Sequence, residues 1–333
     1  MRDLAGCIGA LAYTYADHLW PIRGFLAESG LDGGAVYIRH GRGKADFIQS
    51  GNGDSHFKSA LFPIASLSKP ITAALIRRLI HDGRISLDTR VSGIIPELDA
   101  AHDRRYRTIT IQMLLQHTAG FDRGMSGDPL YDTRDGHTYI AGCTRAIEHI
   151  VSRPFDHDPG TSIVYDNIGY CMLGVVIECL THLTYERAVD TYLLEPAGIP
   201  AGQLRLGPLQ GSHDRCAEAA MDNRHCWYLF KSAGGWQANI ASLARLYARD
   251  VGSPDIATTP SARFSGSYYG LGWRVWKDDA GHPYYTHFGL LPGVFTLAVA
   301  RPDGRVAVAF FNGTPHDADA ASRQLTAILL RKL

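Results

Sequence analysis

Ser66 and Lys69 stand three residues apart, directly before an apolar run that begins at Ile71. On one turn of helix, side chains at this spacing lie on the same face, so the lysine amine can reach the serine hydroxyl. An amine placed there can remove the hydroxyl proton and make the serine oxygen a nucleophile. The segment therefore predicts a serine nucleophile with its own base.

The same spacing occurs at Ser55 and Lys58, and a chain of this length contains about one such pair by chance. The pair at Ser66 differs because a helical apolar pattern follows it and Gly83 stands where a helix should end. Pro70 is tolerated only in a first turn, which puts the helix start at Ser66 or Leu67. The alternative is a serine cap followed by a solvated lysine.

Tyr165 and Asn167 stand two residues apart in a loop before an apolar helical segment. Such side chains can project together into a cleft. Tyr165 can relay a proton if cationic neighbours lower its pKa, and Asn167 can orient a substrate carbonyl or the lysine. The alternative is an aromatic plug beside an asparagine helix cap.

A third candidate segment runs from Thr286 to Leu290 in a strand-like part of the chain. Gly289 allows another backbone to approach closely, as a substrate lying along the strand requires. The Leu290 N–H can then combine with the Ser66 N–H as a two-donor oxyanion hole. The alternative is a strand glycine at a bulge.

Taken together, these motifs resemble those of the serine β-lactamase and penicillin-binding-protein superfamily, in particular its class C-like branch with carboxypeptidases, D-aminopeptidases, esterases and transacylases. The resemblance covers the chain from about Gly33 to Asn312. Further segments similar to the family are Asp82 to Asp88, Leu114 to Gly120, Ala233 to Trp236 and Tyr269 to Trp273.

The resemblance implies an acyl-enzyme mechanism. Ser66 would attack an ester or amide carbonyl, while Lys69 and Tyr165 share the roles of base and proton relay. Which of the two takes the proton is left open. The oxyanion would lie between the backbone amides of Ser66 and Leu290. His287 would replace the lysine of Lys-Thr-Gly members, and Asn167, Phe288 and Gly289 would join it in substrate binding.

Two residues depart from the family pattern. Phe288 stands where a threonine commonly binds a substrate carboxylate, so penicillins and D-Ala-D-Ala ends are less expected, and an apolar wall or a displaced side chain is expected instead. Asp166 occupies the middle of the Tyr-x-Asn motif. If it faced the cleft it would raise the pKa of Lys69. We expect it to face away, because adjacent residues in an extended loop point in opposite directions.

The order of elements predicts how the site is held. A helix to about Ser29 and a hairpin over 35–48 come first, helices with long loops fill about 67–245, and four strands and a helix end the chain. We therefore expect an α+β, β-lactamase/transpeptidase-like fold. Residues 1–65 and 246–333 would form an antiparallel sheet flanked by terminal helices, and 66–245 an inserted helical domain, with the site between them.

Composition limits the partners of this chain of 333 residues. Lys plus Arg equals Asp plus Glu at 33 each, so no positive field attracts nucleic acid or anionic lipid. No run approaches the roughly 18 apolar residues of a membrane helix, and no signal peptide is recognisable. We expect a cytoplasmic protein that acts on a small ester or amide, with an acyl acceptor as a second partner, unless a leader has been removed.

The six cysteines at 7, 143, 171, 179, 216 and 226 contain no C-x-x-C pair. Cys171 and Cys179 lie in an apolar segment, which favours buried free thiols in a reducing compartment. His213, Cys216, His225 and Cys226 fit no zinc spacing, so we expect neither a metal nor a cofactor.

Several functions remain open at this stage. The first is a serine hydrolase acting on a small ester or amide through an acyl-enzyme. An acyltransferase would use the same intermediate and exclude water. D-aminopeptidase, DD-carboxypeptidase or β-lactamase activity and a catalytically silent binding domain complete the alternatives. Loops around 121–140 and 205–232 should supply the pocket, with Tyr131, His137 and Trp227 as an aromatic lining.

Overall fold

The computed structural model describes residues 21–41, 43–51, 57–134, 137–208 and 224–333. Ser55, Cys7, His213 and Cys216, on which some expectations rested, lie outside these residues, as does part of each predicted pocket loop.

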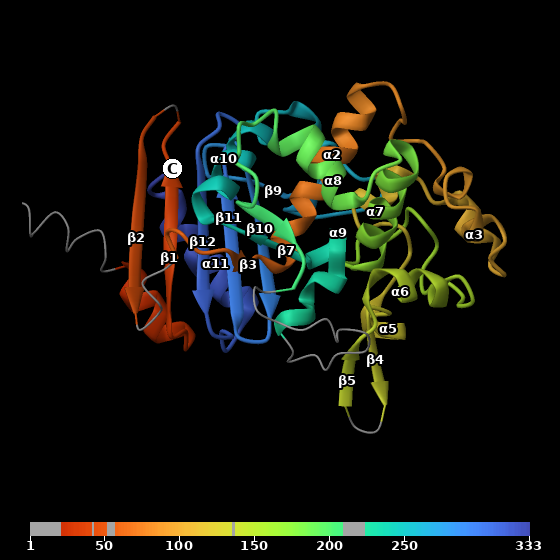
Figure 1. Cartoon of the computed structure of the whole chain (residues 1–333), viewed down its shortest axis with the longest axis horizontal. Helices are drawn as coiled ribbons and strands as arrows, with labels where there is room; N and C mark the ends of the chain where they lie inside the picture. Colours follow the sequence, from red (N-terminus) through yellow and green to blue (C-terminus); the bar gives the residue numbers. More distant parts are fainter. Residues whose placement is uncertain (1–20, 42, 52–56, 135–136, 209–223) are drawn as a thin grey trace, which may run out of the picture.

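A seven-stranded antiparallel sheet joins the two ends of the chain (Figure 1). Its strand order is β2-β1-β12-β11-β10-β9-β8, and β1 pairs along its whole length with β12. The first hairpin of the described chain is thus completed by its last strand. The strands are β1 (Gly33–Arg39), β2 (Ala45–Gly51), β8 (Tyr268–Tyr269), β9 (Arg274–Lys277), β10 (Pro283–Leu291), β11 (Val294–Ala300) and β12 (Val306–Asn312).

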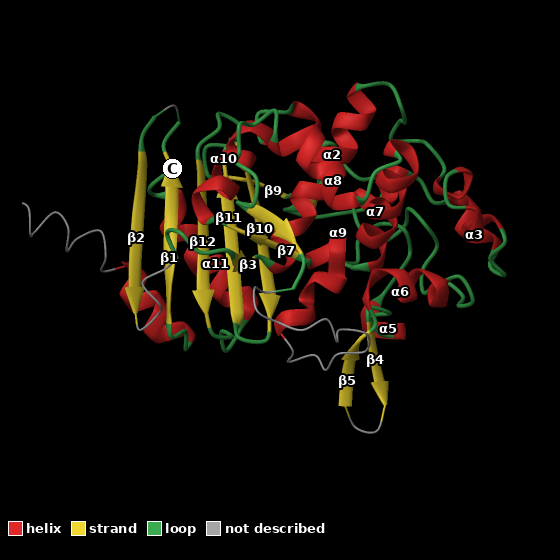
Figure 2. Ribbon diagram, viewed as in Figure 1, coloured by secondary structure: helices red, strands yellow, loops and turns green. Residues whose placement is uncertain are grey.

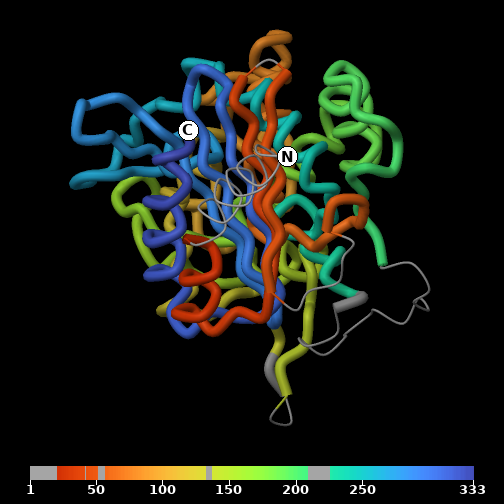
Figure 3. The backbone as a smooth tube through the Cα atoms, turned by 90° about the vertical axis from the view of Figure 1, so that its left-hand side faces the viewer, coloured from red at the N-terminus to blue at the C-terminus, as the bar shows by residue number. Residues whose placement is uncertain are grey.

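Helices cover both faces of this sheet. A helix over 21–29 and α11 (Ala318–Leu330) lie side by side on one face (Figure 3), where Phe25 and Leu325 join a buried apolar cluster with Val36 and Phe311 of the strands. On the other face α10 (Ile240–Asp250) packs against β1 and β12. The apolar residues on both faces explain why β11 and β12 are buried almost throughout.

The middle of the chain forms a mainly helical region beside the sheet (Figure 2). Its helices are α2 (Ser68–His81), α3 (Pro96–Asp99), α4 (Ile111–Leu115), α5 (Arg123–Ser126), α6 (Gly142–Ile150), α7 (Ile168–Thr181), α8 (Tyr185–Val189) and α9 (Lys231–Gly234). Short strands β3 (Phe62–Pro63), β7 (Trp236–Ala238) and β6 (Leu204–Leu206) form a second sheet, and β4 (Tyr131–Arg134) pairs with β5 (His137–Ile140) as a hairpin. Shorter helical turns are η1 (Ala65–Leu67), η2 (Val91–Gly93), η3 (Arg104–Thr108), η4 (Asp190–Leu194), η5 (Arg224–Phe230) and η6 (Pro254–Ala257).

The predicted fold class is confirmed: an antiparallel sheet built from both chain ends stands beside a large helical insertion. The expected boundary between residues 245 and 246 falls inside α10, a helix that packs on the sheet.

The helix that carries the predicted nucleophile begins later than its sequence indicates. Ser66 lies in the 3-10 turn η1, and α2 starts at Ser68. Ala65, just before the serine, has a positive φ of 49°. A left-handed alanine is disfavoured on its own, so the surrounding packing must hold this turn.

Strand β10 supplies that packing at Gly289. A Cβ atom there would come within 2.4 Å of Thr296 Oγ1, 2.6 Å of the Ile64 carbonyl oxygen and 2.9 Å of the Ala65 Cβ. Thr296 also donates a hydrogen bond of 2.9 Å to the Ile64 carbonyl. The sheet therefore presses directly on the turn that presents Ser66, and only glycine fits at this point of contact.

The expectation of free thiols is wrong for Cys143, Cys171 and Cys226, which are disulfide-bonded. Cys143 of α6 and Cys171 of α7 form a disulfide, whereas Cys179 is free and exposed. Cys143 and Cys171 are both buried, as the apolar segment around Cys171 indicated for that residue, and their burial in one place allows them to bond. The disulfide removes the support that these cysteines gave to a reducing compartment.

Among the described residues, no single helix is long and apolar enough to cross a membrane. Residues Ile168–Thr181 and Tyr185–Leu194 pass that test only as a pair, with a bend of 74° between them. Most residues of α7 are buried in the protein core, as expected of a core helix.

The contact at Gly289 generates a first prediction. Gly289→Ala should displace the turn that carries Ser66 and lower the free energy of unfolding by about 1–3 kcal/mol through overpacking. Denaturant unfolding measures the change. Gly252→Ala is the control, since a Cβ there meets only the Pro302 carbonyl oxygen at 3.6 Å. Equal stability of the two variants would contradict the close contact.

The disulfide generates a second prediction. Replacing Cys143 and Cys171 together by serine should lower the free energy of unfolding by about 3–4 kcal/mol, because the bond closes a loop with a sequence separation of 28. Cys179→Ser, at the exposed free thiol, should change it by less than about 0.5 kcal/mol. Unchanged denaturation of the double variant would show that the bond does not form.

Candidate active site

Ser66 opens onto a cleft of about 810 Å³ between the sheet and the helical region. Its walls come from the end of β10, the start of α11, α5 and α9. The lining residues are Ala65, Ser66, Arg123, Tyr131, Tyr165, Asn167, Phe230, Ala233, Gly234, Tyr269, Arg274, Phe288, Leu290, Leu291, Pro292, Thr314, Ala318 and Asp319. The volume suits a small organic molecule.

Lys69 lies fully buried beneath Ser66. Its Nζ atom is 3.3 Å from Ser66 Oγ, 2.7 Å from Asn167 Oδ1 and 2.6 Å from the Ala233 carbonyl oxygen. These partners belong to η1, to the residue before α7 and to α9. The predicted pair of serine and lysine is therefore formed, and two further elements hold the amine in place.

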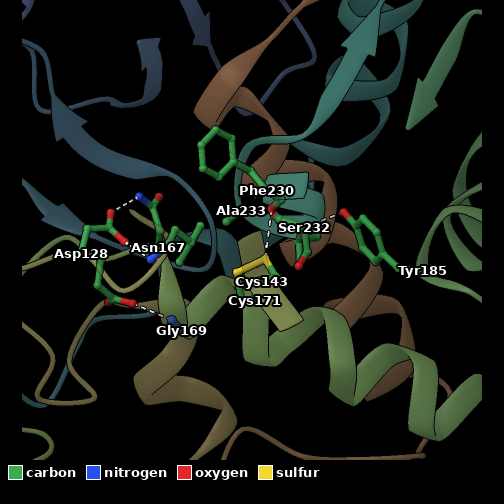
Figure 4. The surroundings of a disulfide bond; sticks show 12 residues. Asp128, Cys143, Asn167, Gly169, Cys171, Tyr185, Phe230, Ser232 and Ala233 are labelled. Carbon is green, nitrogen blue, oxygen red and sulfur yellow. Dashed lines mark hydrogen bonds between the residues drawn. A yellow bond between two sulfur atoms is a disulfide. The ribbon is translucent and has the colours of Figure 1, made fainter. Parts of the chain in front are cut away.

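A buried polar network fixes the stretch of backbone that contains Ala233. Thr72 of α2 donates to the Ser232 carbonyl oxygen at 2.7 Å and contacts the Tyr185 hydroxyl at 2.8 Å. The Trp236 indole N–H donates to the same hydroxyl at 3.0 Å. Figure 4 shows this part of α9 above the disulfide of α6 and α7. The acceptor that Lys69 needs is thus anchored from α2 and α8.

The pKa of Lys69 is lowered to about 7. Burial is the main cause, and it is opposed by the negative charges of Asp166 and Asp128. Arg123 adds a smaller effect in the same direction as burial. A lysine with this pKa is neutral in a large fraction of molecules at neutral pH, as a general base must be.

Asn167 is oriented by Asp128, a residue that the sequence analysis did not single out. The Asn167 Nδ2 atom donates to Asp128 Oδ2 at 2.6 Å (Figure 4), and this leaves Oδ1 to face Lys69. The Leu130 N–H donates to the other carboxylate oxygen at 3.1 Å. Asp128 lies in a Gly-Asp-Pro sequence that is typical of a turn, so the pattern gave no signal of this role.

The Tyr165 ring lies near two basic side chains. Lys69 Nζ is 4.8 Å from the ring centroid and the Arg123 guanidinium carbon 5.2 Å. The hydroxyl is buried and has no hydrogen-bond partner among the described residues. The condition of a lowered Tyr165 pKa is not met: burial first, and then Tyr269, raise the pKa well above its usual value, although Ser66 and Arg123 oppose the shift. Tyr165 is therefore a protonated phenol.

Asp166 points away from the cleft, as expected, although its charge still raises the pKa of Lys69. It is buried, with Oδ2 at 3.1 Å from His117 Nδ1 and Oδ1 accepting the Gly169 N–H at 2.6 Å. The His117 carbonyl oxygen also accepts the Val164 N–H at 2.9 Å. His117 therefore contacts both Val164 and Asp166, the residues on either side of Tyr165.

The His117 ring lies 4.5 Å from the Tyr165 ring, centroid to centroid. Burial lowers the His117 pKa, although the hydrogen bond to Asp166 opposes the shift. This packing fixes the position of the tyrosine ring.

His287 is buried in β10 and does not line the cleft. Nδ1 lies 2.9 Å from the Phe288 carbonyl oxygen, an obligate acceptor, so the ring proton is on Nδ1. Nε2 is buried with no hydrogen-bond partner in the described chain. Burial, aided by the charge of Lys69, lowers the His287 pKa to about 3. A neutral ring therefore stands where the resemblance implies that other members carry a lysine.

The end of β10 borders the cleft. Strand β9 pairs only with Pro283–Thr286, so among the described strands the segment from His287 onward has no partner on that side. Leu290 is 41% exposed and lines the cleft with Phe288, whose ring also packs 6.4 Å from Phe295. Phe288 thus forms part of an apolar wall, one of its two expected placements. The close approach at Gly289 is made by the Ile64 carbonyl, and the Leu290 N–H stays a predicted oxyanion donor.

The aromatic lining is only partly as expected. Tyr131 lines the cleft, whereas Trp227 is buried elsewhere in the core and His137 packs beside Tyr139. Arg123, which lies in the predicted pocket loop 121–140, also lines the cleft, as do Arg274 and Asp319, which were not predicted. In the described parts of the chain, no three His, Cys, Asp or Glu side chains are grouped so that they could hold a metal ion.

Solved structures with the same fold include two amide-cleaving enzymes. A D-stereospecific amidohydrolase from Streptomyces sp. has a TM-score of 0.71 at 21% identity, covering 92% of this chain and 96% of that chain. The D-amino acid amidase of Ochrobactrum anthropi SV3 has a TM-score of 0.70 at 18% identity, covering 94% and 98%. At these identities the likeness establishes the fold.

Sequence relatives extend this likeness. Penicillin-binding protein 4 of Amycolatopsis lactamdurans is 28% identical over 299 residues, which cover 80% of this chain and 76% of that protein. The putative fimbrial assembly protein FimD, serogroup D, of Dichelobacter nodosus is 36% identical over 193 residues, and the match covers 56% of this chain and 48% of that protein. The family model for beta-lactamase matches residues 22–331. The chain therefore belongs to the β-lactamase family, within the superfamily of serine hydrolases that also contains the penicillin-binding proteins.

Proposed function

We propose that this protein is a serine hydrolase that cleaves a small amide or ester through an acyl-enzyme on Ser66, with Lys69 as the general base. The likeness in fold to an amidohydrolase and an amidase supports amides as the first class to test. The observation that carries the proposal is the set of three contacts around the buried Lys69 amine.

Those contacts define where the lone pair of a neutral Lys69 points. A neutral amine has two N–H donors and one lone pair. Asn167 Oδ1 and the Ala233 carbonyl oxygen can only accept, so they take the two N–H groups at 2.7 and 2.6 Å. The two atoms Lys69 Nζ and Ser66 Oγ lie 3.3 Å apart, so in the neutral form the remaining lone pair would accept the Ser66 hydroxyl proton. Lys69 is thereby prepared to take the serine proton.

Acylation then balances without another reactant. The Ser66 oxygen bonds to the carbonyl carbon, its proton moves to Lys69, and the carbon–nitrogen or carbon–oxygen bond to the leaving group breaks. Tyr165 passes a proton to the leaving group and regains one from Lys69. Water releases the acyl group, its hydrogens passing to the acid product and to the Ser66 oxygen. The raised pKa of Tyr165 favours this role of proton carrier over that of base.

Two backbone amides are proposed to hold the oxyanion, those of Ser66 and Leu290. Ser66 stands at the start of a helical segment, and Leu290 lies on the part of β10 that borders the cleft. Donors arranged before the reaction stabilise the negative charge that develops on the carbonyl oxygen.

The cleft favours a substrate with an apolar group. Phe288, Leu290 and Leu291 from β10 line the same cleft as Phe230 and Tyr131 from the helical region. Phenylalanine at 288 offers no hydroxyl to bind a carboxylate, so β-lactams and D-Ala-D-Ala ends are expected to be poor substrates. Whether water or another acceptor removes the acyl group depends on the acceptor supplied, and adding alcohols or amines during turnover measures it.

The nucleophile is tested by covalent labelling with a fluorophosphonate. Ser66→Ala should abolish both labelling and hydrolysis, because it removes the hydroxyl that Lys69 is placed to activate. Ser55→Ala, at the second Ser-x-x-Lys spacing, should leave both nearly unchanged. Normal labelling of the Ser66→Ala protein, read by intact mass, would refute the assignment.

The base is tested by the pH dependence of labelling. Burial lowers the pKa of Lys69, so its neutral form predominates above about pH 7 and is lost below it. The labelling rate should therefore rise through about pH 7 and reach a plateau. Neither nearby histidine accounts for such a midpoint, because burial lowers the pKa of His117 and holds that of His287 at about 3. A midpoint near 10 would mean that Lys69 is not the base in this form.

A further inference from the structure

We propose that Asp128 is a positioning residue that holds the carbonyl oxygen of Asn167 toward Lys69 and thereby directs the lysine lone pair onto Ser66. This inference rests on the proposed function of Ser66 and Lys69. It assigns to Asp128 an effect on the reaction through two intervening side chains.

The geometry of Asp128 suits this task. Asp128 lies 39 residues before Asn167 in the chain, and its Oδ2 atom accepts a hydrogen bond from the Asn167 Nδ2 group at 2.6 Å. The Oδ1 atom accepts the Leu130 N–H at 3.1 Å, which ties the carboxylate to its own loop. Both oxygens are thus engaged by donors from different segments. Asp128 does not line the cleft, so direct contact with substrate is not its role.

Burial raises the pKa of Asp128, and the hydrogen bonds from Leu130 and Asn167 oppose that shift. In its ionised form, the Asp128 carboxylate leaves Asn167 one favourable orientation. Only the Nδ2 group of an asparagine can donate, so it must turn toward Asp128, and Oδ1 must turn toward Lys69. Without an acceptor at position 128, the side-chain amide of Asn167 could rotate by 180° and exchange its oxygen and nitrogen. Nδ2 would then offer an N–H to Lys69, whose lone pair would accept it in place of the Ser66 hydroxyl.

The substitution Asp128→Asn would produce this rotation. The Leu130 N–H requires an acceptor, so the carbonyl oxygen of the substituted side chain would remain with Leu130 and its amide group would face Asn167. Two amides cannot both donate across one contact. Asn167 would therefore present its oxygen to position 128 and its Nδ2 group to Lys69.

The charge of Asp128 adds a second effect that can be measured. Several groups face Lys69: the carboxylates of Asp128 and Asp166, the Arg123 guanidinium, the rings of Tyr165 and Tyr170, and the neutral His287. Asp128 and Asp166 favour the ammonium form and Arg123 disfavours it. Removing the charge at 128 moves the acid limb of the reaction to lower pH, whereas loosening the site would admit water and move it to higher pH.

The test is the rate of fluorophosphonate labelling from pH 5 to 10 for wild type, Asp128→Asn, Asn167→Ala and the double variant. Asp128→Asn should lower the plateau rate roughly 100-fold, as expected for a misdirected reacting group, and shift the acid limb to lower pH. In the Asn167→Ala background the same change should lower the plateau rate less than about twofold, because Asp128 acts through the missing amide.

Asp158→Asn is the matched control, since that carboxylate is 71% exposed and pairs with Arg105 at 2.8 Å. It should label as wild type does. If Asp128→Asn fails to fold, Asp128→Glu keeps the charge but moves the acceptor, and it should lower the rate while leaving the acid limb in place. A wild-type rate in the substituted protein, an acid limb at higher pH, or equal losses in both backgrounds would overturn the inference. Absence of a Ser66 adduct in the wild type would instead overturn the proposed function.

Discussion

The burial of the Lys69 amine among three oxygen atoms is the constraint on which the rest of the site depends. An ammonium in the same place would lack the solvation that water provides, which is why burial lowers the Lys69 pKa to about 7. Two of the oxygens, on Asn167 and Ala233, can only accept hydrogen bonds. The third belongs to the serine. The protonation state of Lys69 and the direction of its lone pair therefore both follow from the burial of the amine among these three oxygens.

Each of those oxygens is fixed by a different part of the fold. The turn with Ser66 is pressed against β10 at Gly289, and the Ala233 carbonyl is anchored through the network of Thr72 and Tyr185. Asn167 directly precedes α7, which a disulfide at Cys171 joins to α6. The sheet and the helical insertion thus meet at Lys69. A structural change in either part would alter the contacts of the lysine amine.

The resemblance carried by Ser66, Lys69, Tyr165 and the His287 segment was enough to predict the fold class, because such motifs occur in one order along one architecture. Long periodic segments such as 294–300 and 168–181 also matched closely. Contacts between residues far apart in the chain could not be predicted from the sequence. The bond between Cys143 and Cys171 depends on how α6 and α7 pack, and sequence shows only that both residues are apolar in context.

Electrostatic states were the least predictable part of the site. Burial outweighs the opposing charge of Arg123 and raises the pKa of the Tyr165 phenol, a balance that the residue types alone do not reveal. Asp128 escaped notice because its Gly-Asp-Pro context is that of an ordinary turn, and its partner Asn167 lies 39 residues away. Phe288, by contrast, indicated an apolar wall from its side chain alone, and it lines the cleft.

A neutral Lys69 in the folded protein is the central claim, and its titration can be observed directly. With lysine labelled at the ε-carbon by ¹³C, the NMR signal of Lys69 can be assigned by its loss in Lys69→Arg and followed from pH 5 to 11. The account predicts a midpoint near pH 7, because burial among Asn167, Ala233 and Ser66 disfavours the ammonium. A midpoint near 10, the value of a solvated lysine, would contradict it.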